Sequence, residues 1–188
     1  MARPRSEERR SAILAAATRV IAAQGLGAAT ATIAQEADVS NGSLFTYFAT
    51  KADLMNQVYV VLKTEMAAVA LDGLPTASDV HGQMLFVWTH WLRWATSCHE
   101  KRRTLAQLDV SEMITVESHQ VARQALADVR ALLERSCARG PLRDAPLEFT
   151  VALMVALANA TIDAMIRDPA NADAYCMTAF DALWRMIA

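Results

Sequence analysis

Residues 32–51 read TIAQEADVSNGSLFTYFATK, and this stretch decides the fold of the first part of the chain. Small polar residues, one glycine and several aromatic residues stand here between two apolar helical patterns. Ser40 can cap a helix over residues 41–47, and Thr30 can cap a shorter helix that ends at Ala37, because their side-chain oxygens accept hydrogen bonds from free backbone N–H groups. Two short helices separated by three residues predict a helix-turn-helix.

The residues of this segment fit a tight turn between two packed helices. Asp38 occupies a turn position that favours a positive φ, where glycine is the easy choice and aspartate is tolerated at some cost. Ala34 is small enough to let the two helices cross closely. We expect the buried contacts to come from Ile33, Ala37 and Leu44.

The polar residues of the second helix favour contact with DNA. A helix that reads the major groove brings its backbone close to the bases and offers short hydroxyl and amide groups. Asn41 can bond an adenine in a bidentate way, and Gly42, which costs roughly 1 kcal/mol relative to alanine inside a helix, permits close approach. The alternative is a capped surface helix with incidental hydroxyls. The predicted DNA contacts are Thr30, Ser40, Asn41, Gly42, Ser43, Thr46, Tyr47 and Lys51.

Lys51 gives a separate indication. Thr50 can cap the next helix together with Asp53, which leaves Lys51 in the first turn. The helix dipole disfavours a cation there by roughly 0.3 to 1 kcal/mol, and a nearby phosphate would reverse that cost. The other interpretation is an exposed lysine that tolerates the cost.

Residues 13–55, ILAAATRVIAAQGLGAATATIAQEADVSNGSLFTYFATKADLM, resemble the DNA-binding domain of the tetracycline-repressor (TetR) family. The family pattern is a first helix, then I-A-x-x-A-G-V-S, a variable residue, G-[ST]-L-[YF]-x-[YH]-F and a K-x-x-L start to the fourth helix. The sequence departs from it at the turn, where Asp38 replaces glycine, and at Phe45, which has no hydroxyl group to donate. Ala28 and Ala29 stand where many members carry a hydroxyl, so the phosphate contact moves to Thr30 or Thr32.

The resemblance implies a two-domain, all-α protein: a helix-turn-helix DNA-binding domain at residues 1–50 and a helical effector-binding and dimerisation domain at residues 51–188. It also implies a homodimer that forms through the last two long helices, binds a palindromic double-stranded DNA operator and releases it when a small-molecule effector binds. Repression is the family's usual sign, and activation remains an alternative.

Composition agrees with a helical protein. The chain of 188 residues is 54% apolar and rich in helix-forming alanine, leucine, methionine and arginine, and its pattern predicts about nine helices. The three cysteines lack C-x-x-C pairing, which favours reduced thiols over disulfides or a zinc site. The start lacks the apolar core of a signal peptide, and the most apolar run, FTVALMVALANA, is too short to cross a bilayer. We therefore expect a cytoplasmic protein with no cofactor.

Charge is distributed unevenly along the chain. The net charge is −2, but residues 1–51 carry six Lys/Arg against four Asp/Glu, and residues 52–188 carry twelve against sixteen. This asymmetry indicates a modest polyanion-facing end, although many basic N-terminal tails are only solvated. We expect Arg3 and Arg5 to follow the DNA backbone or enter the minor groove.

A helix after residue 80 carries three tryptophans at three-residue spacing. Trp88, Trp91 and Trp94 can line a pocket for an apolar, aromatic or cationic ligand, or they can fill a core. We expect Trp88 and Trp91 to face the interior and Trp94 to lie at its margin. Phe86 and His90 fall on the opposite face. The predicted ligand-binding residues are Met84, Trp88, Trp91 and Met113.

Two segments complete the prediction. A long helix is expected over residues 116–138, and the chain ends in two alanine-rich helices suited to close packing in a dimer. In the last helix, Ala179 and Leu183 lie on an apolar stripe that we assign to the interface. The rival interpretation is a small-molecule-binding or metal-binding helical bundle that acts without DNA. No G-x-S-x-G, H-E-x-x-H or phosphate-loop motif supports an enzyme, and no histidine pair has metal-ligand spacing.

Overall fold

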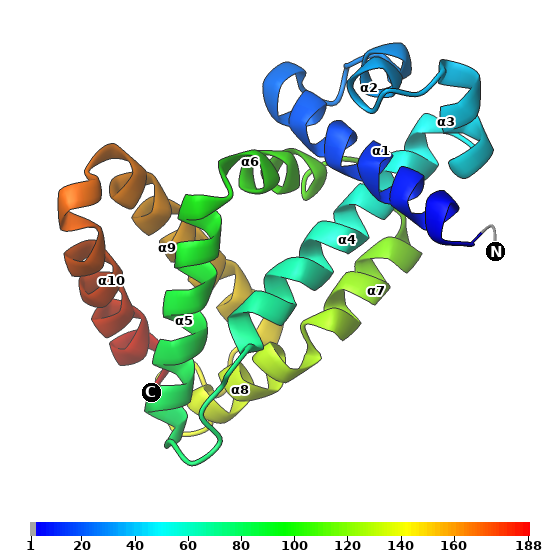
Figure 1. Ribbon diagram of the computed structural model, residues 1–188. Helices are drawn as coiled ribbons and strands as arrows, with labels where there is room; N and C mark the ends of the chain where they lie inside the picture. Colours follow the sequence, from blue (N-terminus) through cyan, green and yellow to red (C-terminus); the bar gives the residue numbers. More distant parts are fainter. Residues whose placement is uncertain (1–2) are drawn as a thin grey trace. The chain divides into compact units, whose positions relative to one another are not determined.

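The computed structural model describes residues 3–188, with side chains from Ser6 onward, and in this range the chain is all-helical (Figure 1). Ten α-helices and one short 3-10 helix occur there, close to the nine helices expected. The side chains of Arg3 and Arg5, which we predicted to approach DNA, lie outside the described residues. The α-helices are α1 (Arg3–Gln24), α2 (Thr30–Glu36), α3 (Asn41–Tyr47), α4 (Lys51–Leu71), α5 (Val80–Ser97), α6 (His99–Leu108), α7 (Val116–Ala125), α8 (Ala127–Cys137), α9 (Leu147–Arg167) and α10 (Ala172–Ile187), and the 3-10 helix is η1 (Pro169–Asn171).

The helices form two compact units. The first contains Met1–Thr64 and Cys98–Gln124, and the second contains Glu65–Ser97 and Ala125–Ala188. The first unit is therefore larger than the DNA-binding domain predicted at residues 1–50, because α6 and α7 pack with it. The functional boundary between residues 50 and 51 stays a prediction.

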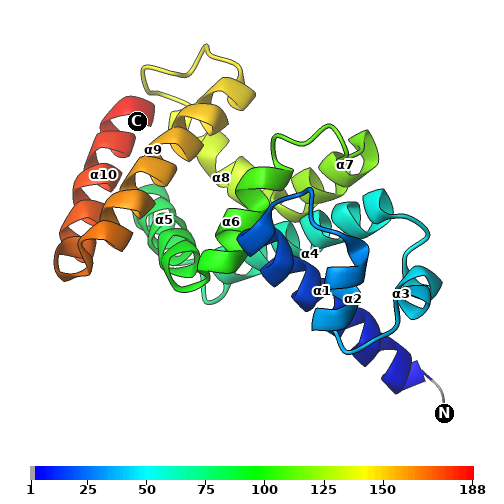
Figure 2. The ribbon, with the colours of Figure 1, turned by 90° about the horizontal axis from the view of Figure 1, so that it is seen from above.

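In the first unit, α1 packs against α2 and α6, and α2 packs against α3 (Figure 2). Ile33 and Leu44 are fully buried, as predicted, whereas Ala37 is only half-buried. Thr104 on α6 donates a hydrogen bond of 2.7 Å to the carbonyl oxygen of Thr18, which holds α6 on α1 at a buried position. Residues far along the chain thus complete the core of the helix-turn-helix.

Two helix boundaries differ from the prediction. Thr30 is the first residue of α2 and makes no capping bond, because Ala29 holds the extended N-cap conformation. The helix expected over residues 116–138 is two helices, separated at Leu126 with φ −95° and ψ 10°. The division separates the buried face of α7, which belongs to the first unit, from that of α8, which belongs to the second.

In the second unit, α5 packs against α8, α9 and α10, and α9 and α10 lie side by side (Figures 1 and 2). The stripe of α10 that we assigned to a dimer interface is partly wrong: Leu183 is fully buried within the protomer, and Ala179 is half-buried. Cys176 and Phe180 lie on the same buried face. A stripe at helical spacing therefore marks the core face here.

Helix α9 is longer and more apolar than the sequence argument allowed. Its 21 residues have the length and hydropathy of a membrane-spanning helix, and only 33% of the apolar window is buried. Core helices of soluble proteins pass the same test. Asn159 and Asp163 interrupt its exposed face, and polar groups at the middle of a membrane-spanning helix are costly in lipid.

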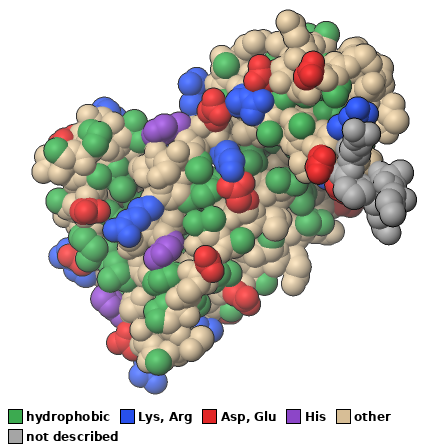
Figure 3. Space-filling view, in the orientation of Figure 1, with side chains coloured by type: hydrophobic (Ala, Val, Ile, Leu, Met, Phe, Trp, Pro, Cys, Tyr) green, Lys and Arg blue, Asp and Glu red, His purple; other side chains and the backbone are tan. Residues whose placement is uncertain are grey.

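Acidic and basic side chains are interspersed on the face of the protein drawn in Figure 3.

Candidate nucleic-acid interface

Helix α3 begins with the cap that its sequence predicts. The Ser40 hydroxyl accepts a hydrogen bond of 3.0 Å from the backbone N–H of Ser43 and lies 2.9 Å from the Ser43 hydroxyl. Asp38 adopts a φ of 54°, which confirms the left-handed turn position before the helix. Cap and turn together fix where α3 starts relative to α2.

One face of α3 is exposed and carries small residues. Leu44 is fully buried, and at 100° per residue the direction opposite to it is taken by Gly42 and Thr46. Ser43 and Phe45 flank these two positions, and all four are exposed. The outward face of α3 therefore has a low profile at its centre.

The predicted DNA contacts differ in how free their polar groups are. The Thr46 hydroxyl donates 3.3 Å to the carbonyl oxygen of Gly42, and the hydroxyls of Ser40 and Ser43 lie within hydrogen-bonding distance of each other. Within the described part of the chain, the Asn41 amide and the Tyr47 hydroxyl make no hydrogen bond, and Asn41 is exposed while Tyr47 is half-exposed. These two groups are the best placed to bond another molecule. Thr30 is half-buried and also has no partner in the described residues.

Gly42 has no internal reason to be a glycine. A Cβ atom built on it would meet only the Ser40 hydroxyl, at an ordinary contact distance of 3.9 Å, and its φ lies in the range open to any residue. Alanine would therefore fit the isolated protomer and favour the helix. The missing side chain leaves room on the outside of α3.

Lys51 lies in the first turn of α4, as predicted. Asp53 donates its N–H to the Thr50 hydroxyl at 3.0 Å and accepts the N–H of Ala49 at 2.9 Å, so both members of the cap are engaged. The Lys51 ammonium donates to the carbonyl oxygen of Ala28 at 2.7 Å and is half-buried. Lys51 thus ties α4 to the start of α2 and is more than a freely exposed lysine. An ammonium has three N–H donors, so two remain for an external acceptor.

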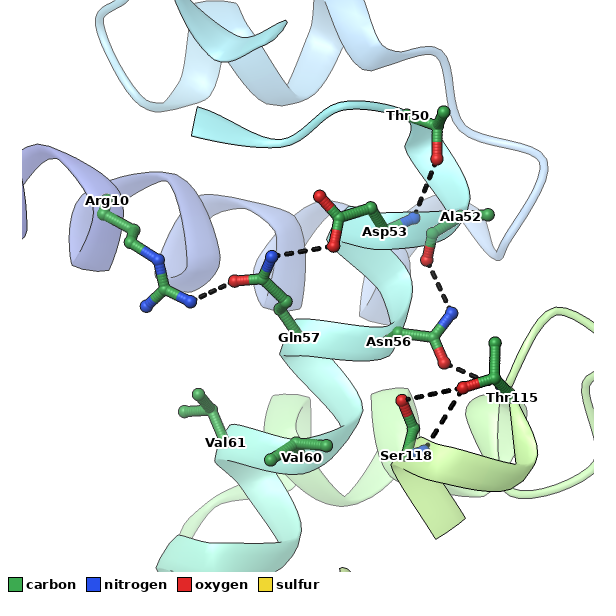
Figure 4. Close-up of a pocket in the computed structure, with 10 residues that line it drawn as sticks. All are labelled: Arg10, Thr50, Ala52, Asp53, Asn56, Gln57, Val60, Val61, Thr115 and Ser118. Atoms are coloured by element: carbon green, nitrogen blue, oxygen red, sulfur yellow. Dashed lines mark hydrogen bonds between the residues drawn. The ribbon is translucent and has the colours of Figure 1, made fainter. Parts of the chain in front are cut away.

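An open groove of about 540 Å³ lies beside this cap and was not predicted (Figure 4). The Arg10 guanidinium donates a hydrogen bond to the amide oxygen of Gln57. The amide N–H of Gln57 donates a hydrogen bond of 2.7 Å to the Asp53 carboxylate. Asn56 donates 2.8 Å to the Met113 carbonyl oxygen and accepts the N–H of Thr115 at 2.8 Å. These contacts join α1, α4 and the start of α7 within the first unit, at sequence separations that no local pattern reveals.

The predicted ligand residues are distributed over both units. Met84 and Trp88 are 1% and 0% exposed, and the Trp88 indole N–H donates 3.1 Å to the Cys176 carbonyl oxygen. The order predicted for the other two tryptophans is wrong. Trp94 is buried and donates 3.0 Å to Glu65, whereas Trp91 is half-exposed, with its ring 6.2 Å from that of Trp88.

Met113 belongs to the first unit, where its main chain is held by Asn56 and Ser111. Phe86 and His90 stack on each other with ring centroids 3.7 Å apart. Neither of these residues is buried, in agreement with their predicted place on the face opposite the tryptophans.

The environments of His119, Cys137 and Cys176 indicate structural roles for these side chains. The Tyr59 hydroxyl lies 3.1 Å from Nδ1 of His119, and burial together with the Asp109 carboxylate raises the pKa of Tyr59. Burial also raises the pKa of the Cys137 and Cys176 thiols, which makes them poor nucleophiles. Among the described residues, no three His, Cys, Asp or Glu side chains are grouped to hold a metal ion.

Comparison with known proteins agrees with the helix-turn-helix. Residues 13–58 match the sequence profile of the family described as bacterial regulatory proteins, tetR family. The fold is that of a putative tetR family transcription regulator from Shewanella sp. PV-4, with a TM-score of 0.85 and 24% identity over 94% of this chain and 96% of that chain. A TetR family transcription regulator from Marinobacter aquaeolei VT8 has a TM-score of 0.85 and 19% identity over 97% of this chain and 96% of that chain.

A third similar structure contains a ligand. The transcriptional regulator FadR from Bacillus subtilis, in complex with stearoyl-CoA, has a TM-score of 0.72 and 14% identity over 95% of this chain and 99% of that chain. Residues 13–58, which include the capped turn before α3, thus match the tetR family of bacterial regulatory proteins, and the chain has the all-helical fold of the tetR family regulators described above.

Proposed function

We propose that this regulator is a non-enzymatic, cytoplasmic repressor that binds a palindromic operator as a dimer and is released by a small, mainly apolar or aromatic effector. The observation that carries the proposal is the exposed face of α3, centred on a glycine that the protomer does not require, with the unpaired polar groups of Asn41 and Tyr47 at the two ends of the helix. In this arrangement α3 enters the major groove and Asn41 bonds a base edge. Thr30, Tyr47 and Lys51 bond phosphates.

The proposed phosphate contacts can be tested with variants that remove either the charged side chain of Lys51 or the neutral hydroxyl of Tyr47. Replacement of Lys51 by glutamine should weaken binding to every sequence and lower the salt slope of log K by about 0.9, because one fewer counterion is released. Tyr47→Phe should also weaken all sequences but leave the slope unchanged, since a hydroxyl carries no charge. Fluorescence anisotropy at four salt concentrations, on random duplex DNA and on a selected operator, measures both.

Asn41→Ala is the matched variant for base contact. It should weaken the selected operator by about 5- to 100-fold and random DNA hardly at all, because a bidentate base contact is worth roughly 1 to 3 kcal/mol of discrimination. Equal losses on both DNAs, or failure of the unmodified chain to bind any duplex, would rule out the role assigned to α3.

We assign the dimer contact to α9 and α10. The face of α9 opposite to its buried residues carries Phe149, Ala152, Ala156 and Ala160, and Phe149 is 53% exposed. Small residues allow close helix approach, and the apolar stretch from Phe149 to Ala156, which precedes Asn159 and Asp163 on the same exposed face, needs a partner in water. In a two-fold dimer, α9 and α10 of each protomer would form a four-helix bundle. Such a dimer can present two α3 helices to half-sites about 34 to 36 Å apart.

Ala156→Glu tests this interface. The substitution places a carboxylate at the centre of the α9 stripe, and two-fold symmetry presents it twice, so the dimer should dissociate. Ala131→Glu is the matched control, since Ala131 is an exposed alanine on α8 and the change in charge is the same. Light scattering should give a monomer for the first variant and a dimer for the second. A dimeric Ala156→Glu protein would locate the interface elsewhere.

The effector site is proposed in the second unit around Trp91. Trp91 leaves part of its ring exposed next to the buried ring of Trp88, so it can stack on a flat or apolar molecule, and Met84 lies two turns earlier on the same helix. The structure of FadR in complex with stearoyl-CoA supports an apolar ligand in a protein of this fold, because that ligand carries a long acyl chain. An effector that favours a dimer with the wrong spacing of α3 helices would release DNA, which requires different affinities for the two states.

A further inference from the structure

We infer that Phe45 recognises the C5-methyl group of a thymine close to the base that Asn41 contacts, and so helps to set the operator sequence. Phe45 is 41% exposed, and it is the one large apolar side chain among the described residues of α1 to α3 that is exposed. The inference rests on the proposed function, since it requires α3 in the major groove. It adds a specificity-determining residue of a different chemical type from Asn41.

The position of Phe45 on α3 supports this role. It follows Asn41 by four residues, so the two side chains lie about 40° apart around the helix axis and about 6 Å apart along it. Phe45 also flanks Gly42, the position with no side chain. A helix placed close to DNA at Gly42 therefore brings Phe45 to the base edges on the same side as Asn41. The two contacts then fall within about two base pairs, which are about 3.4 Å apart.

The chemistry of the Phe45 side chain limits the groups of DNA that it can recognise. Phe45 has no hydroxyl, so it cannot donate to a phosphate oxygen or to a base acceptor. A single exposed apolar side chain is common and needs no explanation by itself, but this one stands on the face of α3 that we place against DNA. In the major groove the apolar group on offer is the thymine C5-methyl, which neither cytosine nor either purine carries. Phe45 thus favours thymine at its position.

The experiment removes the methyl group and nothing else. The full chain first selects its operator from random duplex DNA. Each thymine of that operator is then replaced by deoxyuridine, symmetrically in both half-sites, and the affinity is measured at fixed salt. At one thymine near the base read by Asn41, the unmodified protein should lose about four-fold in affinity for each half-site, the equivalent of one buried methyl group.

A Phe45→Ala variant completes the cycle. It should bind the thymine and deoxyuridine operators equally at that position, and its salt slope should equal that of the unmodified protein, because no phosphate contact is lost. Phe45→Leu keeps an apolar side chain and should retain part of the response to the methyl group. Since Phe45 is exposed, both variants should melt close to the unmodified protein, and the deoxyuridine scan of the unmodified protein stands without either variant.

Two outcomes overturn the inference in distinguishable ways. If the protein selects an operator but no thymine shows a loss that depends on Phe45, the role of Phe45 is wrong and the proposed function stands. If the protein selects no sequence at all, both are wrong. A methyl effect that persists in Phe45→Ala assigns the contact to another residue and also overturns the inference.

Discussion

Replacement of Trp88 by alanine should lower the free energy of unfolding by about 3 to 5 kcal/mol, the largest stability effect we expect for any exchange on α5. The Trp88 ring is fully buried, and its N–H is bonded to the Cys176 carbonyl oxygen on α10 at 3.1 Å. The exchange leaves a cavity the size of an indole between α5 and α10, and neighbouring side chains refill such a space only in part. Urea denaturation followed by far-UV circular dichroism measures the change.

Two other variants show which part of the effect is packing. Trp88→Phe keeps most of the ring and should cost far less than alanine, although it removes the donor to Cys176. Trp91→Ala should also cost less than Trp88→Ala, because Trp91 is half-exposed. If the two alanine variants lost equal stability, Trp88 would not be the centre of the core of the second unit.

The Trp88→Ala and Trp91→Ala variants also distinguish a residue of the core from a residue of the proposed ligand site. Trp91→Ala should leave DNA binding without effector nearly intact and weaken the response to an apolar ligand, with stearoyl-CoA as the first probe because a protein of this fold binds it. Trp88→Ala should weaken both functions together, because the exchange destabilises the fold on which both depend. Tryptophan fluorescence and DNA anisotropy in one titration should then share a midpoint in the unmodified protein.

The helix-turn-helix could be predicted from sequence because its determinants are local. The Ser40 hydroxyl caps a helix that begins one residue later, and Asp38 takes the left-handed turn position within the same segment. Such interactions involve residues a few positions apart, and each residue type has a strong preference for its place. The exposure of the α3 face follows directly once Leu44 is fixed as the buried position.

The rest depended on contacts between distant residues. Lys51 donates a hydrogen bond to the carbonyl oxygen of Ala28, and Asn56 bonds the main chain of Met113 and Thr115. The spacing of apolar residues along the chain indicates none of these contacts. An apolar stripe predicts which side of a helix is covered but not what covers it. For this reason the sequence pattern assigns Leu183 of α10 to a partner, whereas its own protomer buries it. The prediction that Trp91 faces the interior and Trp94 lies at the margin is wrong, because the Trp94 N–H donates a hydrogen bond to Glu65, 29 residues earlier in the chain.

Replacement of Gly42 by alanine should change stability and DNA binding in opposite directions. Within the protomer the added methyl group meets only the Ser40 hydroxyl at 3.9 Å, and alanine is the better helix former, so the free energy of unfolding should rise by up to about 1 kcal/mol. On DNA the same methyl group lies at the centre of the exposed face, where it holds α3 away from the bases. We expect the affinity for the selected operator to fall at least ten-fold, or about 1.4 kcal/mol.

The opposite signs make Gly42→Ala a sharper test of the interface than a variant that removes a contact. A loss of DNA binding through misfolding would lower the melting temperature, whereas steric exclusion leaves it equal or higher, so one protein preparation measured both ways distinguishes the two causes. Gly27→Ala is the matched control, because its added methyl group meets no atom within 4 Å and lies off α3. It should keep operator affinity within about three-fold of the unmodified chain, less than the ten-fold step that 1.4 kcal/mol represents. A Gly42→Ala protein that bound the operator as tightly as the Gly27→Ala protein would mean that the backbone of α3 does not approach DNA, and the roles assigned to Asn41 and Phe45 would be wrong with it.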